Sequence, residues 1–281
     1  MKKAILTATL ILILAPAAWA QNGAKGHPFT ALTAFGDSYS DNGYADGHGF
    51  YRPSSTWTWV EYMAQMMGDL THDNWAFSGA MSDERNCNLA DMNWSGLLWQ
   101  IDEYLKGLPD KADLSTTLFT ILCGSNDVWG GLEDPGQSAK NIREAMTRLA
   151  KAGAKHIVYR EASAVIMAPG YLAGDYAKYH DPWAKAVNEQ NKATKKELLE
   201  GFAKDFPEVK VYYMESDPLF TKIKNNEPGF QFKIFDKPWQ GTYTMPVAGD
   251  YMWYDPWHFM GEVHRLMAVE SCDIVLKALE K

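Results

Sequence analysis

The chain alternates short runs of apolar residues with longer segments whose apolar positions recur every three or four residues. Most of the short runs are rich in β-branched and aromatic residues and end at small or polar residues, which predicts strands. They cover residues 29–35, 74–77, 116–123, 155–159 and 209–214. The longer segments have the period of amphipathic helices. They cover residues 57–67, 94–108, 138–152, 183–202 and 259–279.

This alternation of strands and helices favours an α/β fold. Right-handed strand–helix–strand units keep the strands parallel, and the helices then cover both faces of the sheet. We therefore predict a three-layer sandwich around a five-stranded parallel sheet. Residues 21–281 have the length of one large α/β domain, and no internal repeat or low-complexity tract divides them.

Two segments, 168–182 and 225–254, follow neither period and are rich in glycine, proline and aromatic residues. Long irregular segments in a compact domain usually have a function or are disordered. The aromatic side chains in 225–254 favour an ordered loop that packs on the domain. Its apolar, aromatic character and its position shortly before His258 in the sequence bear on the substrate, as discussed below.

The first twenty residues have the layout of a secretory signal peptide. Lys2 and Lys3 precede an apolar run over residues 4–15, and Ala18-Trp19-Ala20 forms a small-residue cleavage site. The apolar run is too short for a membrane span, which needs about 20 residues. We expect cleavage after Ala20 and a secreted or periplasmic protein that is not stably inserted in a membrane.

The charge of the chain limits its partners. Removal of Lys2 and Lys3 takes the formal net charge from −8 to −10, because residues 1–20 contain no acidic residue. An acidic protein is a poor match for nucleic acid or for an anionic membrane surface. We expect a small-molecule or lipid ester as the partner, for the chemical reasons below, and no nucleic acid.

The three cysteines have different surroundings in the sequence. Cys123 ends an apolar run, which indicates a buried free thiol. Cys87 and Cys272 lie among more polar residues, and an exported protein folds in an oxidising compartment. The sequence therefore favours, without requiring, one disulfide between Cys87 and Cys272.

Polar residues with complementary chemistry follow the predicted strands. Ser38, Gly79 and Asn126 come after the first three strands, whose carboxyl ends share one edge of a parallel sheet. Asp255 and His258 precede the last predicted helix and are three residues apart. A serine nucleophile needs a base, an acid that orients the base, and donors for an oxyanion, and these five residues supply all of them.

These blocks occur in an order that resembles the GDSL esterases, also called SGNH hydrolases. The resemblance rests on Gly36-Asp37-Ser38 with the following Ser40-Asp41-Asn42-Gly43, on the Asn-x-Ala-x-x-Gly-Ala pattern of residues 74–80, on Gly124-x-Asn126-Asp127 and on Asp255-x-x-His258. It extends over nearly all of residues 21–281 and is strongest for the secreted bacterial lipase and phospholipase-like branch. The chain departs from the family's usual leucine at Tyr39 and from its common proline at Phe259.

The resemblance implies a flavodoxin-like SGNH hydrolase fold and a role for each residue. Ser38 is the nucleophile, His258 the general base and Asp255 the residue that orients it. The backbone amides of Ser38 and Gly79 and the side-chain amide of Asn126 form the oxyanion hole. From the residues themselves, we expect Asp127 to fix its loop and His264 to be structural or on the surface.

Other catalytic schemes find no support in the sequence. The chain has no Gly-x-Ser-x-Gly, no His-Glu-x-x-His and no glycine-rich nucleotide motif. The remaining histidines have no acidic residues at metal-ligand spacing, so we predict neither a metal nor a cofactor.

The sequence thus predicts a secreted serine ester hydrolase and leaves its substrate open. The aromatic segment 225–254 favours a lipase, phospholipase or lysophospholipase that acts on acyl esters. Trp253 and Trp257 could line an acyl pocket or pack beneath the loop. Eleven tryptophans also suit a carbohydrate acetyl esterase, since aromatic faces bind sugars. A non-catalytic binding protein on an esterase scaffold is the third alternative.

Overall fold

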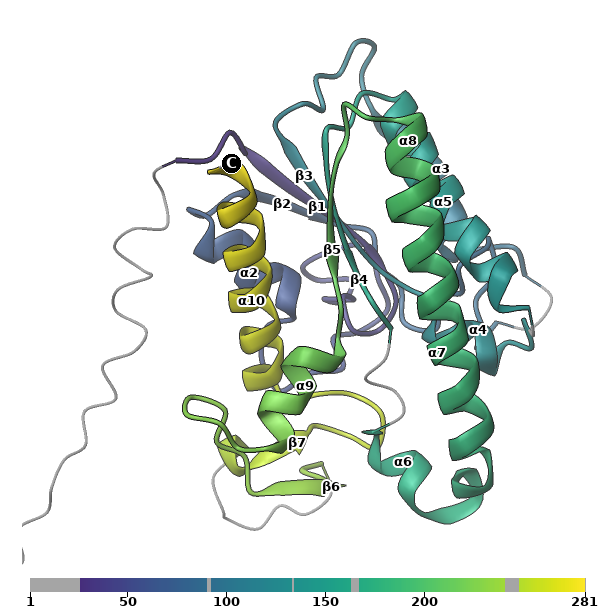
Figure 1. Cartoon of the computed structure of the whole chain (residues 1–281), viewed down its shortest axis with the longest axis vertical. Helices are drawn as coiled ribbons and strands as arrows, with labels where there is room; N and C mark the ends of the chain where they lie inside the picture. The colour runs from purple at the N-terminus through teal and green to yellow at the C-terminus, as the bar shows by residue number, and fades with distance from the viewer. Residues whose placement is uncertain (1–25, 90–91, 133, 163–166, 241–247, 281) are drawn as a thin grey trace, which may run out of the picture.

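The structure is a computed structural model that describes residues 26–89, 92–132, 134–162, 167–240 and 248–280. Its centre is a sheet with the strand order β2-β1-β3-β4-β5, in which all neighbouring strands are parallel. The strands are β1 (Ala31–Gly36), β2 (Thr71–Asn74), β3 (Thr117–Leu122), β4 (His156–Arg160) and β5 (Lys210–Met214). Helices cover both faces (Figure 1), which confirms the predicted three-layer α/β sandwich. The predicted signal peptide, 1–20, lies outside the described residues.

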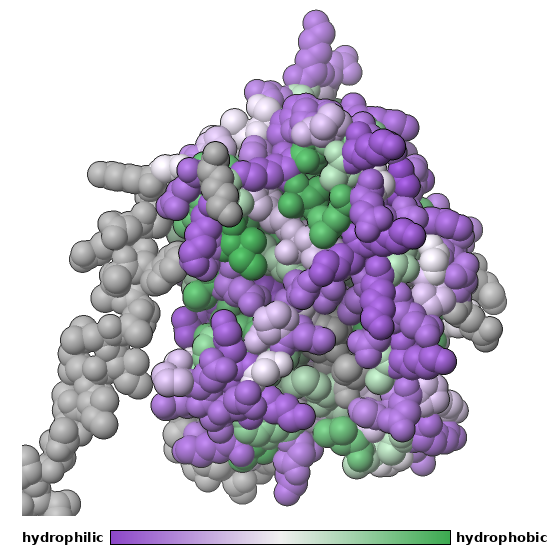
Figure 2. All heavy atoms as spheres, in the orientation of Figure 1, coloured by the Kyte–Doolittle hydropathy of each residue, from purple (hydrophilic) through white to green (hydrophobic). Residues whose placement is uncertain are grey.

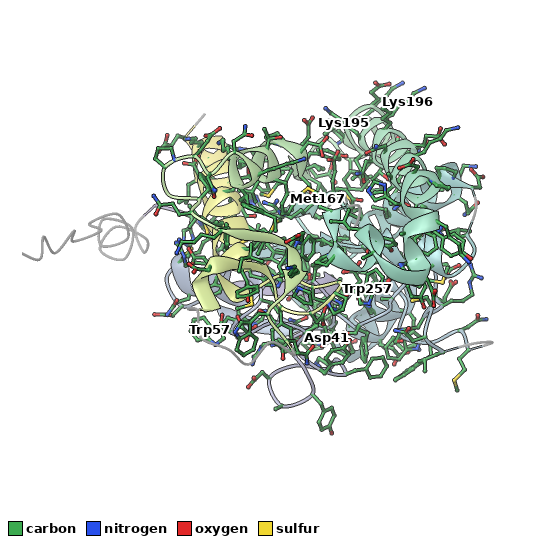
Figure 3. All side chains as sticks on the ribbon, turned by 90° about the horizontal axis from the view of Figure 1, so that it is seen from below. Asp41, Trp57, Met167, Lys195, Lys196 and Trp257 are labelled. Carbon is green, nitrogen blue, oxygen red and sulfur yellow. The ribbon has the colours of Figure 1, made fainter. Side chains whose placement is uncertain are left out.

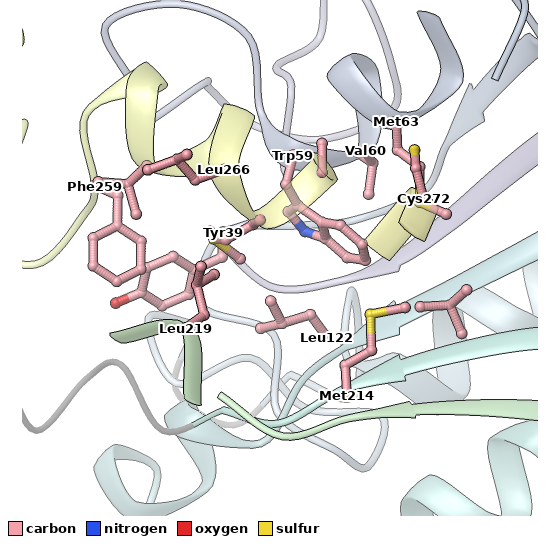
Figure 4. Close-up of a cluster of buried hydrophobic side chains, with 14 of the residues drawn as sticks. Tyr39, Trp59, Val60, Met63, Leu122, Met214, Leu219, Phe259, Leu266 and Cys272 are labelled. Atoms are coloured by element: carbon pink, nitrogen blue, oxygen red, sulfur yellow. The ribbon is translucent and has the colours of Figure 1, made fainter. Parts of the chain in front are cut away.

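One face of the sheet is covered by α2 (Trp59–Met66) and α10 (Gly261–Leu279). Strand residues alternate between the faces, so Leu32 of β1 contributes to this core whereas Phe35 lies on the other side. The core is shown in Figure 4, where Trp59 of α2 and Leu122 of β3 lie close to α10. In this layer α2, from the beginning of the domain, packs against α10, from its end.

The opposite face is covered by α3 (Leu97–Gly107), α5 (Pro135–Lys151) and α7 (His180–Lys196). Their outer surfaces are polar, as the predominantly hydrophilic face over α7 in Figure 2 shows. None of the helices in the described ranges is long and apolar enough to cross a lipid bilayer. The smaller helical elements are α4 (Ser125–Trp129), α6 (Pro169–Leu172), η2 (Gly174–Tyr179), η3 (Glu197–Phe202), α8 (Ala203–Asp205), α9 (Asp217–Lys224) and η4 (Ala248–Asp250).

The second strand lies earlier in the chain than predicted. Residues 74–77 were expected to form it, but β2 ends at Asn74. The Asn74 side chain accepts a hydrogen bond from the Ala76 amide at 3.0 Å, while the amides of Trp75 and Phe77 still donate to carbonyls of β1. The apolar residues that suggested the strand, Ala76 and Phe77, are buried in this continuation of the chain beside β1.

The two aperiodic segments contain more regular structure than the sequence indicates. Segment 225–254 includes a small parallel sheet of β6 (Ile234–Pro238) and β7 (Tyr251–Trp253), and its Phe232 and Trp253 are buried in the core. Segment 168–182 includes α6, η2 and the start of α7. The expected packing of segment 225–254 on the domain is confirmed by these buried side chains. Both segments nevertheless contain regular elements that the sequence did not predict, because tertiary packing fixes elements too short to show a period.

The predicted disulfide is wrong, since Cys87, Cys123 and Cys272 are all free. Cys272 lies on α10 and points into the core against α2 (Figure 4), whereas Cys87 lines a cavity beyond the carboxyl ends of the strands. Cys123 is buried at the end of β3, as predicted.

Candidate active site

The loops at the carboxyl edge of the sheet surround a cavity of about 340 Å³. Ser38 follows β1, Gly79 follows β2, Asn126 lies in α4 after β3, and His258 precedes α10, and all four line this cavity. They come together because parallel strands end at the same edge. Figure 3 looks onto this end of the molecule, where Trp257 and Asp41 are labelled.

His258 is held by Asp255 through a local network. Its Nδ1 lies 2.9 Å from Asp255 Oδ1 and 2.8 Å from Oδ2. Oδ1 also accepts the backbone N–H groups of Trp257 and His258, each at 2.8 Å. Burial alone would raise the pKa of Asp255, but the hydrogen bonds and charge of His258 and the two backbone N–H groups outweigh it, so the pKa lies below its usual value. The carboxyl group is therefore ionised and fixes the imidazole so that Nε2 is left for other partners.

Three potential hydrogen-bond donors belong to residues that line the cavity, namely Ser38, Gly79 and Asn126. Within the described residues, the backbone N–H groups of Ser38 and Gly79 donate to no protein acceptor. The side-chain amide of Asn126 donates to the carbonyl of Ala80 at 3.0 Å and has a second N–H left. Gly79 has φ +86°, and a Cβ there would lie 2.3 Å from Asn88 Nδ2, so the close approach requires glycine.

The Ser38 hydroxyl and the His258 ring share the cavity without a direct contact. In the described part of the chain, no hydrogen bond joins Ser38 Oγ to His258 Nε2. Such bonds are often long in a ligand-free enzyme and shorten when the substrate binds. The structure thus brings the predicted residues to one cavity, while their catalytic roles stay predictions.

Tyr39 joins the first and last loops of the site. Its hydroxyl donates to the Trp257 carbonyl at 2.8 Å, and its ring contacts those of His258 and Phe259. The sequence marked Tyr39 and Phe259 only as departures from the family pattern. The rings of Tyr39 and Phe259 contact each other, with their centroids 5.2 Å apart, so each of these two side chains accommodates the other.

An aromatic wall, consisting of Trp129, Tyr171, Tyr176 and Trp257, lines one side of the cavity. Trp257 makes edge-to-face contacts with the other three rings, with centroids 4.9 to 5.4 Å apart. The first three of these residues were not predicted from the sequence, although the aromatic composition of 168–182 was a signal for two of them.

The aromatic segment 225–254 favoured an acyl-ester substrate, but none of its described residues contributes to this wall or lines the cavity. Trp253 is fully buried in the core, so only Trp257 of the two candidate tryptophans faces the site.

The other polar residues singled out in the sequence are structural. Asp127 accepts the Ser82 amide at 2.7 Å and thereby fixes its loop, as expected. His264 is buried on α10, and burial together with the charge of His258 lowers its pKa to about 3. Among the described residues, no cluster of three His, Cys, Asp or Glu side chains could hold a metal ion.

The chain matches the GDSL-like Lipase/Acylhydrolase family over residues 32–270. It is similar to a solved member of the lipolytic protein G-D-S-L family from Veillonella parvula DSM 2008, with 16% identity, a TM-score of 0.50, and 86% of this chain and 96% of that chain covered. It is also similar to LAE5, an alpha/beta hydrolase enzyme from the metagenome of Lake Arreo, Spain, with 14% identity, a TM-score of 0.50, and 91% and 98% covered. The acetyl xylan esterase AlAXEase has 15% identity and a TM-score of 0.46, with 88% and 98% covered. These similarities to solved structures concern the fold alone, and no curated protein matches the chain in sequence.

Proposed function

The chain belongs to the GDSL-like lipase/acylhydrolase family and is a carboxylic ester hydrolase, and from this premise we propose that it is an exported enzyme that forms an acyl-enzyme on Ser38. The observation that carries the proposal is the common cavity. Ser38, Gly79, Asn126 and His258 line it together, and Asp255 holds His258 from behind.

In the proposed reaction, Ser38 Oγ attacks the ester carbonyl while His258 Nε2 takes its proton. The N–H groups of Ser38, Gly79 and Asn126 donate to the oxyanion of the tetrahedral intermediate. The intermediate collapses as His258 returns the proton to the leaving alcohol, which leaves the acyl group on Ser38. Water, activated by the same imidazole, then releases the acid and regenerates the serine.

We propose acyl esters with an apolar acyl group, including lipid esters, as the substrate class. The aromatic wall supports this choice, because it offers an apolar surface beside Ser38 and His258 in place of the segment favoured by the sequence. A carbohydrate acetyl ester is the second candidate. Trp129 and Tyr176 are 37% and 41% exposed, so their faces are accessible to a sugar ring at the cavity mouth.

A chain-length series of aryl esters, measured on the native protein and on Ser38→Ala, tests the proposal. We expect the native protein to hydrolyse esters longer than acetate, and Ser38→Ala to lose nearly all activity. Ser115→Ala, at the amino-terminal edge of the sheet, is the matched control and should behave as the native protein. Hydrolysis confined to acetyl esters would favour the carbohydrate esterase.

Labelling with a fluorophosphonate tests the nucleophile independently of the substrate. The reagent should modify the native protein at Ser38 and leave Ser38→Ala unmodified. A native protein that is neither labelled nor active would leave the non-catalytic binding protein as the better reading. Export has its own test, which is whether the processed protein begins at Gln21 after expression in a secreting host.

A further inference from the structure

Three loops carry the three proposed oxyanion donors, and each loop is joined to the other two. We call them the serine loop (37–43), the glycine loop (78–82) and the asparagine loop (124–127), after Ser38, Gly79 and Asn126. They follow β1, β2 and β3, which are neighbours in the sheet. The hydrogen bonds between these loops determine how far apart the donors lie.

Asp41 joins the serine loop to the glycine loop. Its Oδ2 accepts both the amide and the hydroxyl of Ser78, each at 2.7 Å. The same carboxylate accepts the amides of Gly43 at 2.9 Å and Phe50 at 3.1 Å. Four donors from three parts of the chain thus converge on one fully buried side chain.

Asp127 joins the asparagine loop to the glycine loop. Its Oδ1 accepts the Ser82 amide at 2.7 Å, and its Oδ2 accepts the hydroxyl of Ser138 at the start of α5. Asp127 and Ser82 are both fully buried, so water does not compete for this link.

Asp37 joins the asparagine loop to the serine loop. Its Oδ2 accepts the hydroxyl of Ser125 at 2.9 Å, and its Oδ1 accepts the amide of Tyr39 at 3.1 Å. The three loops are therefore connected pairwise, each pair by a different buried carboxylate. We refer to these three links as the carboxylate ring.

Every oxyanion donor is next in sequence to a member of the carboxylate ring. Asp37 precedes Ser38 and Ser78 precedes Gly79, while Ser125 and Asp127 flank Asn126. A shift in any one link therefore moves a donor by a comparable distance, since the linked residue and the donor residue are adjacent in the chain. Donors must lie within a narrow range of the oxyanion, so such a shift weakens transition-state binding.

We propose that Asp37, Asp41 and Asp127 are positioning residues that set the spacing of the oxyanion hole through the carboxylate ring. The proposal rests on the function proposed above for Ser38, Gly79 and Asn126. The three aspartates do not act on the substrate themselves. None of these three aspartates lines the cavity.

Stability alone is a poor explanation for three buried carboxylates. Burial raises the pKa of Asp37 and of Asp127 to about 6 and raises the pKa of Asp41 as well. The ionised form of each carboxyl group is therefore less stable in the folded protein than in water. Apolar packing often stabilises a core as well as buried charges do. A carboxylate can, however, accept several backbone and hydroxyl donors at fixed angles, and this fixes the position of the loops.

Ser125→Ala cuts one link without introducing a new group. At pH 8, where all three carboxylates are ionised, we expect kcat for an aryl butyrate to fall about 10- to 100-fold with little change in KM, because only the transition state uses the oxyanion donors. Ser271→Ala is the matched control. It removes another fully buried hydroxyl, which donates to the Met267 carbonyl in α10 and accepts from Arg160 Nη2 at 3.2 Å, and it should lower the melting temperature without lowering kcat.

Two further variants separate positioning from a general loss of folding. Ser125→Thr restores the hydroxyl that donates to Asp37, so it should recover most of the lost kcat. Asp41→Asn turns an amide N–H toward a backbone N–H whichever way it is oriented, because both carboxylate oxygens accept backbone amides. We expect it to lower kcat, whereas Asp46→Asn, at a half-exposed carboxylate on the same stretch of chain, should not.

A double-mutant cycle with Asn126→Ala tests whether the ring acts through the donors. If it does, Ser125→Ala costs less kcat once the Asn126 amide is absent. Equal losses in both backgrounds, or unchanged kcat in Ser125→Ala and Asp41→Asn while the native protein is labelled at Ser38, would overturn the carboxylate ring alone. Absence of fluorophosphonate labelling at Ser38 in the native protein would overturn the proposed function and the ring together.

Discussion

At the scale of single residues, the two oxygens of Asp255 have different tasks. Oδ1 accepts two backbone N–H groups, from Trp257 and His258, and these donors cannot reorient. Both oxygens also lie close to the imidazole Nδ1, which is 2.9 Å from Oδ1 and 2.8 Å from Oδ2, and among the described residues Nδ1 is the only partner of Oδ2. Oδ1 thus shapes the turn, and the two oxygens together select the imidazole tautomer.

This division predicts the effect of Asp255→Asn. The two backbone donors hold the amide oxygen at the Oδ1 position, so the amide NH₂ faces Nδ1 and the imidazole must carry its proton on Nε2. That tautomer cannot accept a proton from Ser38, and we expect kcat to fall on the order of 10³- to 10⁴-fold. Steady-state kinetics with an aryl ester measure the loss. Activity within tenfold of the native value would contradict the assigned role of Asp255.

His264 predicts how stability depends on pH. Burial, with a contribution from the charge of His258, lowers the pKa of His264 from 6.5 to about 3, so the unfolded chain binds a proton at pH 5 that the folded protein does not. Its contribution to the free energy of unfolding is complete above pH 6.5 and is lost as the pH falls toward 3. We expect a loss of about 2 kcal/mol between pH 7 and pH 5 from this residue.

Urea unfolding of the native protein and of His264→Leu at the two pH values isolates that contribution. The variant has no titrating group at this position, so its stability should fall less between pH 7 and pH 5 than that of the native protein. The same pH dependence in both proteins would show that the ring of His264 is accessible to protons in the folded state.

At the scale of elements, α6 and η2 dock against the loop that carries His258. The amide of Gly170 donates to the Pro256 carbonyl at 2.9 Å, and the Trp257 indole packs directly on Gly170. Trp129 Nε1 donates to the Tyr171 hydroxyl from the other side. A short helical element without a predicted period therefore builds the aromatic wall.

Gly170→Ala tests this contact. A Cβ at position 170 would lie 2.2 Å from Cη2 of Trp257, so either the indole or α6 must move. We expect a loss of about 1 to 3 kcal/mol in the free energy of unfolding and a lower kcat/KM, because Trp257 precedes His258. The control is Gly107→Ala at the end of α3, where a Cβ meets nothing within 4 Å. A Gly170→Ala protein with native stability and kinetics would mean that α6 does not support the site.

At the scale of the whole molecule, a buried ion pair connects the sheet to the last helix. Arg160 of β4 is fully buried, and its Nη2 lies 2.7 Å from Glu270 Oε2 on α10. Burial lowers the pKa of Arg160, and the carboxylate of Glu270 opposes that shift. The pair holds α10 on the sheet, and the loop before α10 carries Asp255 and His258.

Glu270→Ala should be much more destabilising than the loss of a surface pair. It leaves the Arg160 guanidinium buried without this partner, and we expect the free energy of unfolding to fall by about 3 to 5 kcal/mol. Asp273→Ala breaks the exposed pair with Lys277 on the same helix and should cost about 0.5 kcal/mol or less. Chemical denaturation compares the two. Equal losses would show that Arg160 gains no more from its partner than a solvated side chain does.

The sequence by itself determined the sheet, the order of its elements and the common edge of its loops. Alternation of apolar runs with helical periods requires only local spacing, and parallel strands then place Ser38, Gly79 and Asn126 at one edge. The position of Asp255 three residues before His258 is local as well. These features were predictable because each depends on residues close together in the chain or on the geometry of a regular sheet.

Tertiary structure alone decided which distant side chains meet. Cys87 and Cys272 remain apart because α10 turns Cys272 into the core, and none of the described residues of the aromatic segment 225–254 lines the cavity. The Gly170–Trp257 contact and the Ser125–Asp37 link likewise join residues far apart in the sequence, the latter 88 positions apart. Such contacts depend on how whole layers pack, and packing is a property of shape and volume that no short stretch of sequence contains.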